Sequence, residues 1–209
     1  MFSLQTIFGK GDKFYGLLED SAESARSSAK ALIELLSTPA TEQSLEKFKQ
    51  ARRREKDLFA QISEELVNTF VTVLDREDIE ALNSALYKIP KVVEKFAERY
   101  TLALDRIEGV DFTSRAVMLE QACKVVEQMV RSLRKGMDLD EVKKLNDQLQ
   151  AIEAEADSQI LELYRDVYAN ETDPIRYLIK MSLFEILEKA IDRCRDAGNV
   201  IYHIVLKNS

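Results

Sequence analysis

The chain has 209 residues, which is enough for one large domain or two small ones with a buried core. Only six glycines and three prolines accompany 32% charged residues, which leaves little room for a sheet with its turns, so an all-α fold is expected. The formal charge of −7 argues against nucleic acid as the main partner, because phosphate contacts need clustered lysine and arginine.

Apolar residues recur at the spacing of one helix face in six segments. Pro39 ends the first of these, and Asp138 and Asp173 are the expected N-caps of the last two. Pro90 lies within the third and is expected to kink it. The predicted helices cover residues 12–37, 41–74, 75–107, 112–135, 138–169 and 174–207.

The six helices fall into two sets of three, offset by about 100 residues and each ordered medium, long, long. Asp57 of the first set answers Asp157 of the second, and Asp75 answers Asp173. We therefore expect two pseudo-symmetric three-helix bundles, residues 1–108 and 109–209, packed as one unit.

The N-terminal segment is apolar but carries no signal-peptide hydrophobic region or cleavage site, so the cytoplasm is the expected compartment, with a peripheral place at the inner membrane left open. No charge-free run exceeds about ten residues, far below the ~20 that a membrane span needs. We expect the segment to pack on the first bundle, with contact to a membrane or transporter as the alternative. Its apolar and basic residues are Phe2, Leu4, Ile7, Phe8, Phe14, Lys10 and Lys13.

Few residues are available for sulfur or imidazole chemistry. Cys123 and Cys194 each lie in an apolar helical pattern, which favours buried, reduced thiols over a disulfide or a ligand role. His203 is the only histidine and lies near the end of the last helix, as a surface residue would. Zinc or Ser-His-Asp chemistry is therefore not expected.

A row of carboxylates borders the apolar stripe of the last helix. Glu188, Asp192 and Asp196 recur every four residues, so each lies roughly 6 Å from the next. Glu153 and Asp157 are one turn apart on the preceding helix and could face them. Five buried carboxylates without a cation would cost many kcal/mol, because each charge loses its hydration.

We therefore predict a cluster of two or more divalent or trivalent metal ions at these five residues. Oxygen ligands suit Mg, Mn, Fe or Ca better than copper. The alternative is a solvated acidic face whose charges pair with Lys180, Lys189, Arg193 and Arg195.

The first bundle carries an altered copy of this constellation. The positions that answer the acidic row hold Tyr87, Lys91 and Lys95, while Arg53 answers Glu153 and Asp57 is kept. We expect no metal here, and we expect these cationic groups to pair with Asp57 and with neighbouring acids such as Glu94. The prediction is one metal site per chain.

Three segments resemble the PhoU-like proteins, in the branch of distant PhoU homologues described as phosphate transport regulators, and the resemblance extends over essentially the whole chain. They are MFSLQTIFGKGDKFYGLLEDSAESA, NTFVTVLDREDIEAL and LFEILEKAIDRCRDAGNVIYHIVLK. The resemblance implies two three-helix bundles that hold iron or similar metals through Glu or Asp-x-x-x-Asp motifs. It also implies a regulatory role in phosphate uptake beside a low-affinity inorganic phosphate transporter.

The family's metal motif carries over only to the second bundle, at Glu153, Asp157, Glu188, Asp192 and Asp196. The resemblance implies acids at the positions of Tyr87, Lys91 and Lys95, so this chain departs from the family pattern in its first bundle.

The leading hypothesis is a non-enzymatic cytoplasmic regulator that docks on the cytoplasmic face of a membrane phosphate transporter. Its metal cluster would be structural or would accept oxygens of the phosphate ion. One rival is a carboxylate-bridged metalloenzyme, although bundles of that kind mix histidine with glutamate. Another is a structural helical module whose acidic row binds a basic partner. Assembly into a homo-oligomer is left open.

Overall fold

The computed structural model describes residues 4–39, 44–136 and 138–209, with side chains from Asp12 onward. In this part of the chain the structure is helical and contains no strand, so the all-α prediction is confirmed. The elements are α1 (Leu4–Ser37), α2 (Glu46–Asn68), α3 (Arg76–Leu102), the short 3-10 helix η2 (Leu104–Arg106), α4 (Thr113–Arg134), α5 (Leu139–Asn170) and α6 (Pro174–Asn208).

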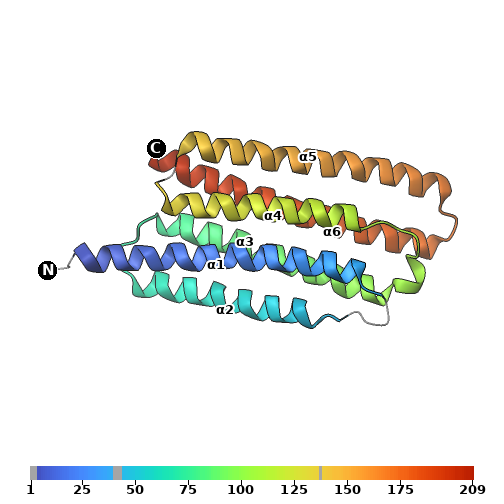
Figure 1. Cartoon of the computed structure of the whole chain (residues 1–209), viewed down its shortest axis with the longest axis horizontal. Coiled ribbons are helices and arrows are strands. Elements are labelled where there is room, and N and C mark those ends of the chain that lie inside the picture. The colour runs from blue at the N-terminus through green and yellow to red at the C-terminus, as the bar shows by residue number, and fades with distance from the viewer. Residues whose placement is uncertain (1–3, 40–43, 137) are drawn as a thin grey trace.

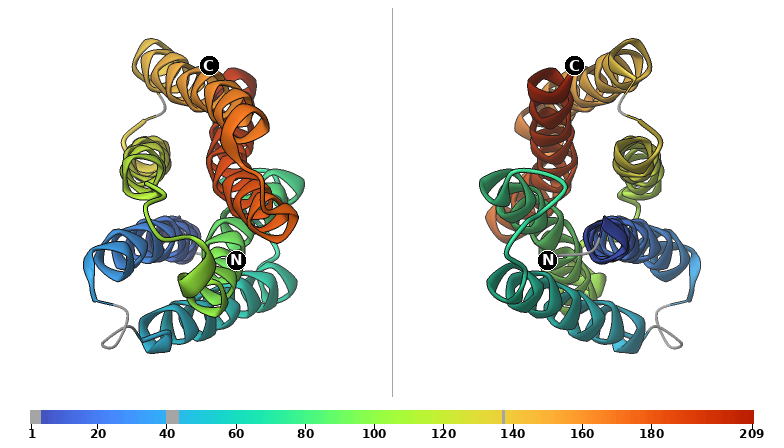
Figure 2. Two further views of the ribbon diagram at one scale, coloured as in Figure 1. Left: turned by 90° about the vertical axis from the view of Figure 1, so that its right-hand side faces the viewer. Right: turned by 90° about the vertical axis from the view of Figure 1, so that its left-hand side faces the viewer.

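The long helices run roughly side by side along one axis (Figure 1). Helices α1, α2 and α3 pack on one another, as do α4, α5 and α6. Across the molecule α1 packs on α4 and α3 packs on α6. Viewed end-on, α2 and α5 are the outermost helices, with the other four between them (Figure 2). Each set of three helices thus contributes two members to an inner group of four.

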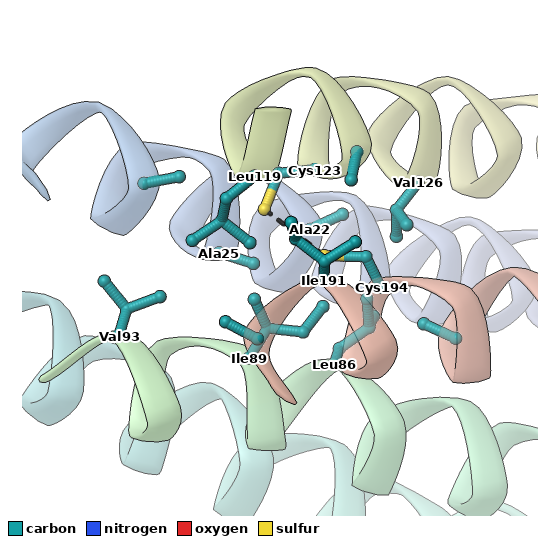
Figure 3. Packing of buried hydrophobic residues seen from close by; sticks show 14 of the residues in the cluster. Ala22, Ala25, Leu86, Ile89, Val93, Leu119, Cys123, Val126, Ile191 and Cys194 are labelled. Carbon is teal, nitrogen blue, oxygen red and sulfur yellow. Dashed lines mark hydrogen bonds between the residues drawn. The ribbon is translucent and has the colours of Figure 1, made fainter. Parts of the chain in front are cut away.

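One hydrophobic cluster runs through both sets of helices. Figure 3 shows Ala22 of α1, Leu86 of α3, Leu119 of α4 and Ile191 of α6 meeting at its centre. All four side chains are almost completely buried. Because the core is continuous between the sets, burial of apolar surface stabilises their association as well as each set by itself.

The two cysteines lie in this core. Cys123 and Cys194 are buried free thiols on α4 and α6, with their sulfur atoms 3.6 Å apart (Figure 3). The prediction of buried, reduced thiols is confirmed.

Two of the helix starts follow the predicted capping chemistry. The Asp138 carboxylate accepts a hydrogen bond from the backbone N–H of Glu141 at 3.0 Å. The Asp173 carboxylate accepts one from Ile175 at 2.8 Å, with Pro174 at the first position of α6. Asp75 precedes α3 but makes no side-chain capping bond, and its carboxylate lies 2.8 Å from Lys207 Nζ.

The predicted extent of the second helix is wrong at its C-terminal end. Helix α2 ends at Asn68 instead of residue 74, and Phe70, which lies within the predicted range, is 90% exposed. Thr69 is extended, and Arg76 donates hydrogen bonds to the carbonyls of Leu66 and Thr69. A side chain of α3 therefore satisfies carbonyl groups that another helical turn would otherwise have to satisfy.

The first helix is longer than predicted, because α1 begins at Leu4 instead of residue 12. The medium, long, long order is consequently wrong for the first set, whose helices have 34, 23 and 27 residues. Phe14 of the N-terminal segment is fully buried, as expected. Phe2 and the side chains of Leu4, Ile7, Phe8 and Lys10 lie outside the described residues.

A polar seam joins the sets along α1 and α4. Arg26 donates to Glu120 at 2.7 Å and to Glu127 at 2.9 Å. Arg131 lies 2.6 Å from the other oxygen of Glu127, which is almost completely buried. Ionic hydrogen bonds of this kind are stronger than neutral ones, so the seam fixes the register of α1 on α4.

At Gly198 a side chain of α5 packs directly against the backbone of α6. A Cβ atom at this position would lie 2.4 Å from Cδ2 of Leu149, a fully buried residue of α5. Gly16 in α1 is a matched contrast, since a Cβ there would meet only Arg134 Nη2, at 3.5 Å.

We expect the same substitution to act differently at the two glycines. Gly16→Ala should raise the free energy of unfolding by up to about 1 kcal/mol, because alanine is the better helix former. Gly198→Ala should leave the free energy of unfolding unchanged or lower it by about 1 to 3 kcal/mol, because the core must shift to admit the methyl group. Urea unfolding followed by circular dichroism measures both. Equal stabilisation by the two substitutions would contradict the packing described for α5 and α6.

Candidate carboxylate site

The five predicted ligands lie along the contact between α5 and α6. Glu153 and Asp157 come from α5, and the row of three acids comes from α6, which packs against it. None of the five is fully buried. The side chain of Glu153 is 14% exposed and that of Asp196 is 38% exposed. They line the margin of the bundle, not its interior. We call these five residues the carboxylate seam.

The cation within the carboxylate seam is a guanidinium group of the same chain. Arg195 donates to Glu153, and its Nη atoms lie 3.5 Å from Asp192 and 3.6 Å from Asp196. Arg193 donates to the second oxygen of Asp196 at 2.6 Å. Three of the five carboxylates therefore have arginine partners. The solvated-face alternative is confirmed for Arg193 and Arg195 but is wrong for Lys180, which pairs with Glu171, and for Lys189, which forms no ion pair with a described residue.

The acids of the two helices nevertheless act on one another. Burial raises the pKa of Glu188, and the negative charges of Asp192 and Asp157 raise it further. Burial also raises the pKa of Asp192, against the opposing charge of Arg195. Among the described residues, neither Glu188 nor Asp157 has an ion-pair partner. This end of the carboxylate seam keeps an uncompensated negative charge.

The donor types suit a hard cation, but their arrangement in this structure does not fit a metal cluster. In the described part of the chain, no three Asp, Glu, His or Cys residues are grouped closely enough to hold a metal ion. Arg195 occupies the space toward which Glu153, Asp192 and Asp196 converge. The metal ligands named from the sequence therefore stay a prediction.

The altered copy in the first bundle is organised by Arg52, a residue that the sequence did not single out. Its Nε atom lies 3.3 Å from Glu94, and its Nη2 atom donates to the Tyr87 hydroxyl at 3.0 Å. The guanidinium carbon lies 4.6 Å from the centre of the Tyr87 ring, which adds a cation–π contact. Helix α2 thus supplies one buried arginine to a tyrosine and an acid of α3.

The expected pairing of Asp57 is wrong. Arg53 donates to Glu46 at 2.7 Å, and Asp57 is exposed. In the described residues Lys91 and Lys95 form no ion pair, although the sequence suggested that they would neutralise neighbouring acids. Adjacent helical residues point about 100° apart, so Arg52 faces the core while Arg53 faces outward.

A buried carboxylate between α1 and α2 was also missed. Glu55 is fully buried and accepts a hydrogen bond from the Ser21 hydroxyl at 2.7 Å. Burial raises the pKa of Glu55, while the bond from Ser21 opposes the rise. Ser21, Ser24 and Ser28 recur at helical spacing on the buried face of α1, and this pattern was the available signal.

Comparison with known proteins supports the resemblance noted in the sequence. No family model matches the chain. The UPF0111 protein YkaA of Bacillus subtilis (strain 168) is 22% identical over 208 residues, covering 96% of this chain and 98% of that protein. A protein named as a pit accessory protein in Rhizobium meliloti (strain 1021) is 23% identical over 208 residues, covering 97% of this chain and 96% of that protein.

Solved structures share the architecture. A PhoU-like phosphate regulatory protein from Shewanella oneidensis MR-1 superposes with a TM-score of 0.78 at 18% identity, covering 93% of this chain and 99% of that one. PhoU from Pseudomonas aeruginosa superposes with a TM-score of 0.65 at 15% identity, covering 99% of this chain and 98% of that one. In the described part of this chain, no helix has an apolar stretch long enough for a membrane crossing.

We expect loss of Arg195 to destabilise the carboxylate seam in a pH-dependent way. Arg195→Gln should lower the free energy of unfolding by about 1 to 2 kcal/mol at pH 7.5, because ionised Glu153, Asp192 and Asp196 lose a shared partner. Arg195 lowers the pKa of Asp192 in the folded protein, so this pKa should rise further in the variant. The loss of stability should therefore shrink as pH falls toward ~4, where carboxylates take up protons.

Urea unfolding at pH 7.5 and pH 4.0 measures this difference. Arg193→Gln is the matched control and should cost less, since among the described residues Arg193 pairs only with Asp196, on its own helix. Equal, pH-independent losses in the two variants would show that Arg195 acts through packing alone.

Proposed function

Because the chain has the fold of the PhoU-like proteins, we propose that it is a non-enzymatic regulator of inorganic phosphate uptake. The observation that carries the proposal is likeness over the full length, both in fold to a phosphate regulatory protein and in sequence to a pit accessory protein. The names of these relatives describe regulation and accessory roles, not reactions.

The proposed site of action is the cytoplasmic face of a membrane phosphate transporter of the low-affinity type. A role beside a transporter agrees with the name of the accessory relative and requires no membrane-spanning helix in the regulator itself. The surface charge fits this place, since a chain of net charge −7 associates weakly with an anionic membrane and would instead be held there by a protein partner.

The residues of the carboxylate seam support a regulatory role more readily than a catalytic one. The only histidine, His203, is exposed near the end of α6, well along the chain from the acids. Three carboxylates are engaged with guanidinium groups, which occupy oxygen atoms that a general acid or base would need to have free.

Phosphate uptake tests the regulatory role. In cells that rely on one low-affinity inorganic phosphate transporter, deletion of this protein should change the uptake rate of radiolabelled phosphate at least twofold, and re-expression should restore it. Uptake of an unrelated amino acid is the control and should not change. Unaltered phosphate uptake in the deletion strain would contradict regulation.

Association with the transporter is tested separately. The purified protein should sediment with vesicles that contain the transporter and not with empty vesicles of the same lipid composition. Equal sedimentation with both would show that the membrane, not the transporter, is the partner.

We propose that the carboxylate seam can exchange its internal cation for a metal ion, iron or a similar one. The support is chemical: Glu188 and Asp157 keep uncompensated charge, and five carboxylates are suitable donors for hard cations. Arg195 would have to leave Glu153 and Asp192 to make their oxygens available. The first bundle, with lysines at the corresponding positions, would bind no metal.

Metal content tests the exchange. After purification without chelators or metal-affinity steps, elemental analysis should find metal in the wild-type protein and little in Asp192→Asn. Arg195→Gln should hold as much metal as wild type or more, because the competing guanidinium is gone. Lys91→Ala is the control and should match wild type. If wild type and Arg195→Gln hold no more metal than Asp192→Asn, the carboxylate seam is neutralised by arginine alone.

A further inference from the structure

A basic groove lies where the two bundles meet along α3 and α6. Its volume is about 470 Å³, within the ~300 to 1,000 Å³ typical of small-molecule sites. The half-buried Val92 and the buried Ile186 contribute apolar lining. The cationic residues that line the groove are Lys88, Lys91 and Lys95 from α3 and Lys189 and Arg193 from α6.

The charge in this groove opposes that of the whole protein. Five cationic side chains face two carboxylates, Glu94 and Glu98, although the chain as a whole has a net charge of −7. Glu94 is engaged with Arg52, 3.3 Å away, and Arg193 with Asp196, 2.6 Å away, so four lysines remain against Glu98. The basic groove therefore concentrates positive charge in a protein whose net negative charge already keeps it soluble.

The lysines of the groove lack internal partners. In the described part of the chain, none of Lys88, Lys91, Lys95 and Lys189 forms an ion pair, and all four are exposed. Three of them follow one another at spacings of three and four residues on α3, where like charges repel by a few tenths of a kcal/mol per pair. A bound anion would relieve this repulsion.

We propose that the basic groove binds a polyvalent phosphate anion, such as a short inorganic polyphosphate. Ammonium groups are compact, hydrated point charges and common phosphate ligands. The row from Lys88 to Lys95 extends about 10 Å along α3, so one orthophosphate could not reach both ends. An anion with charge spread over several phosphate groups could contact α3 and α6 together.

The concave shape favours a free anion over the headgroups of a lipid surface, since a flat bilayer cannot enter between two helices. The site would act whether or not the protein docks on a transporter. It also differs in charge from the carboxylate seam, which lies between α5 and α6, and the two adjoin at Arg193, the partner of Asp196. A ligand there would contact one helix of each bundle.

Titration calorimetry of the full chain with sodium tripolyphosphate tests the site. Wild type should bind with a salt-dependent affinity, and orthophosphate should bind at least tenfold more weakly. Lys91→Ala with Lys95→Ala should weaken tripolyphosphate binding at least tenfold, and Lys189→Ala alone should weaken it at least threefold. The pair Lys143→Ala and Lys144→Ala removes equal charge from exposed positions of α5 and should stay within twofold of wild type.

Vesicles of phosphatidylglycerol provide the second arm. They should not bind wild type more than they bind the Lys91 and Lys95 double variant. No tripolyphosphate binding to wild type, or equal weakening in the α3 and α5 double variants, would overturn the proposal. Vesicle binding that is lost with the lysines, without tripolyphosphate binding, would assign the groove to a lipid surface and overturn it as well.

Discussion

Carboxylates on packed helices repel one another where they approach, and this chain offsets most of that repulsion with its own arginines. In the carboxylate seam Arg195 lies between Glu153 of α5 and the acids of α6. In the seam of α1 and α4, Arg26 bridges Glu120 and Glu127. A guanidinium group can serve two acceptors at once because its donors spread in a plane. An arginine that bridges two or more carboxylates thus links the helices of the second bundle, and another such arginine links the second bundle to the first.

Much of the fold could be predicted because it depends on local patterns. Apolar spacing identified all six long helices, and the capping residues Asp138 and Asp173 gave the starts of α5 and α6. The end of α2 could not be predicted, because it depends on Arg76, which reaches back from the next helix to carbonyls of Leu66 and Thr69. Apolar spacing in one segment contains no information about such a partner.

The candidate sites were predictable in residue type but not in pairing. The sequence placed acids on facing helices, and the electrostatic effect of Asp157 on Glu188 agrees with that. It did not show which cation would lie among them, because Arg195 and a metal ion satisfy the same spacing. Glu55 was hidden for a related reason: within a charged run it resembles a surface residue, and only the serines of α1 show that it is buried.

The continuous core limits the motions that are open to this molecule. Ala22, Leu86, Leu119 and Ile191 come from four different helices and pack into one cluster, so separating the bundles would expose apolar surface along the length of the molecule. The turn around Gly109, whose φ of 80° is left-handed, is therefore unsuited to act as a hinge. A change of state in this molecule would therefore consist of charged side chains exchanging their ion-pair partners while the helices stay packed.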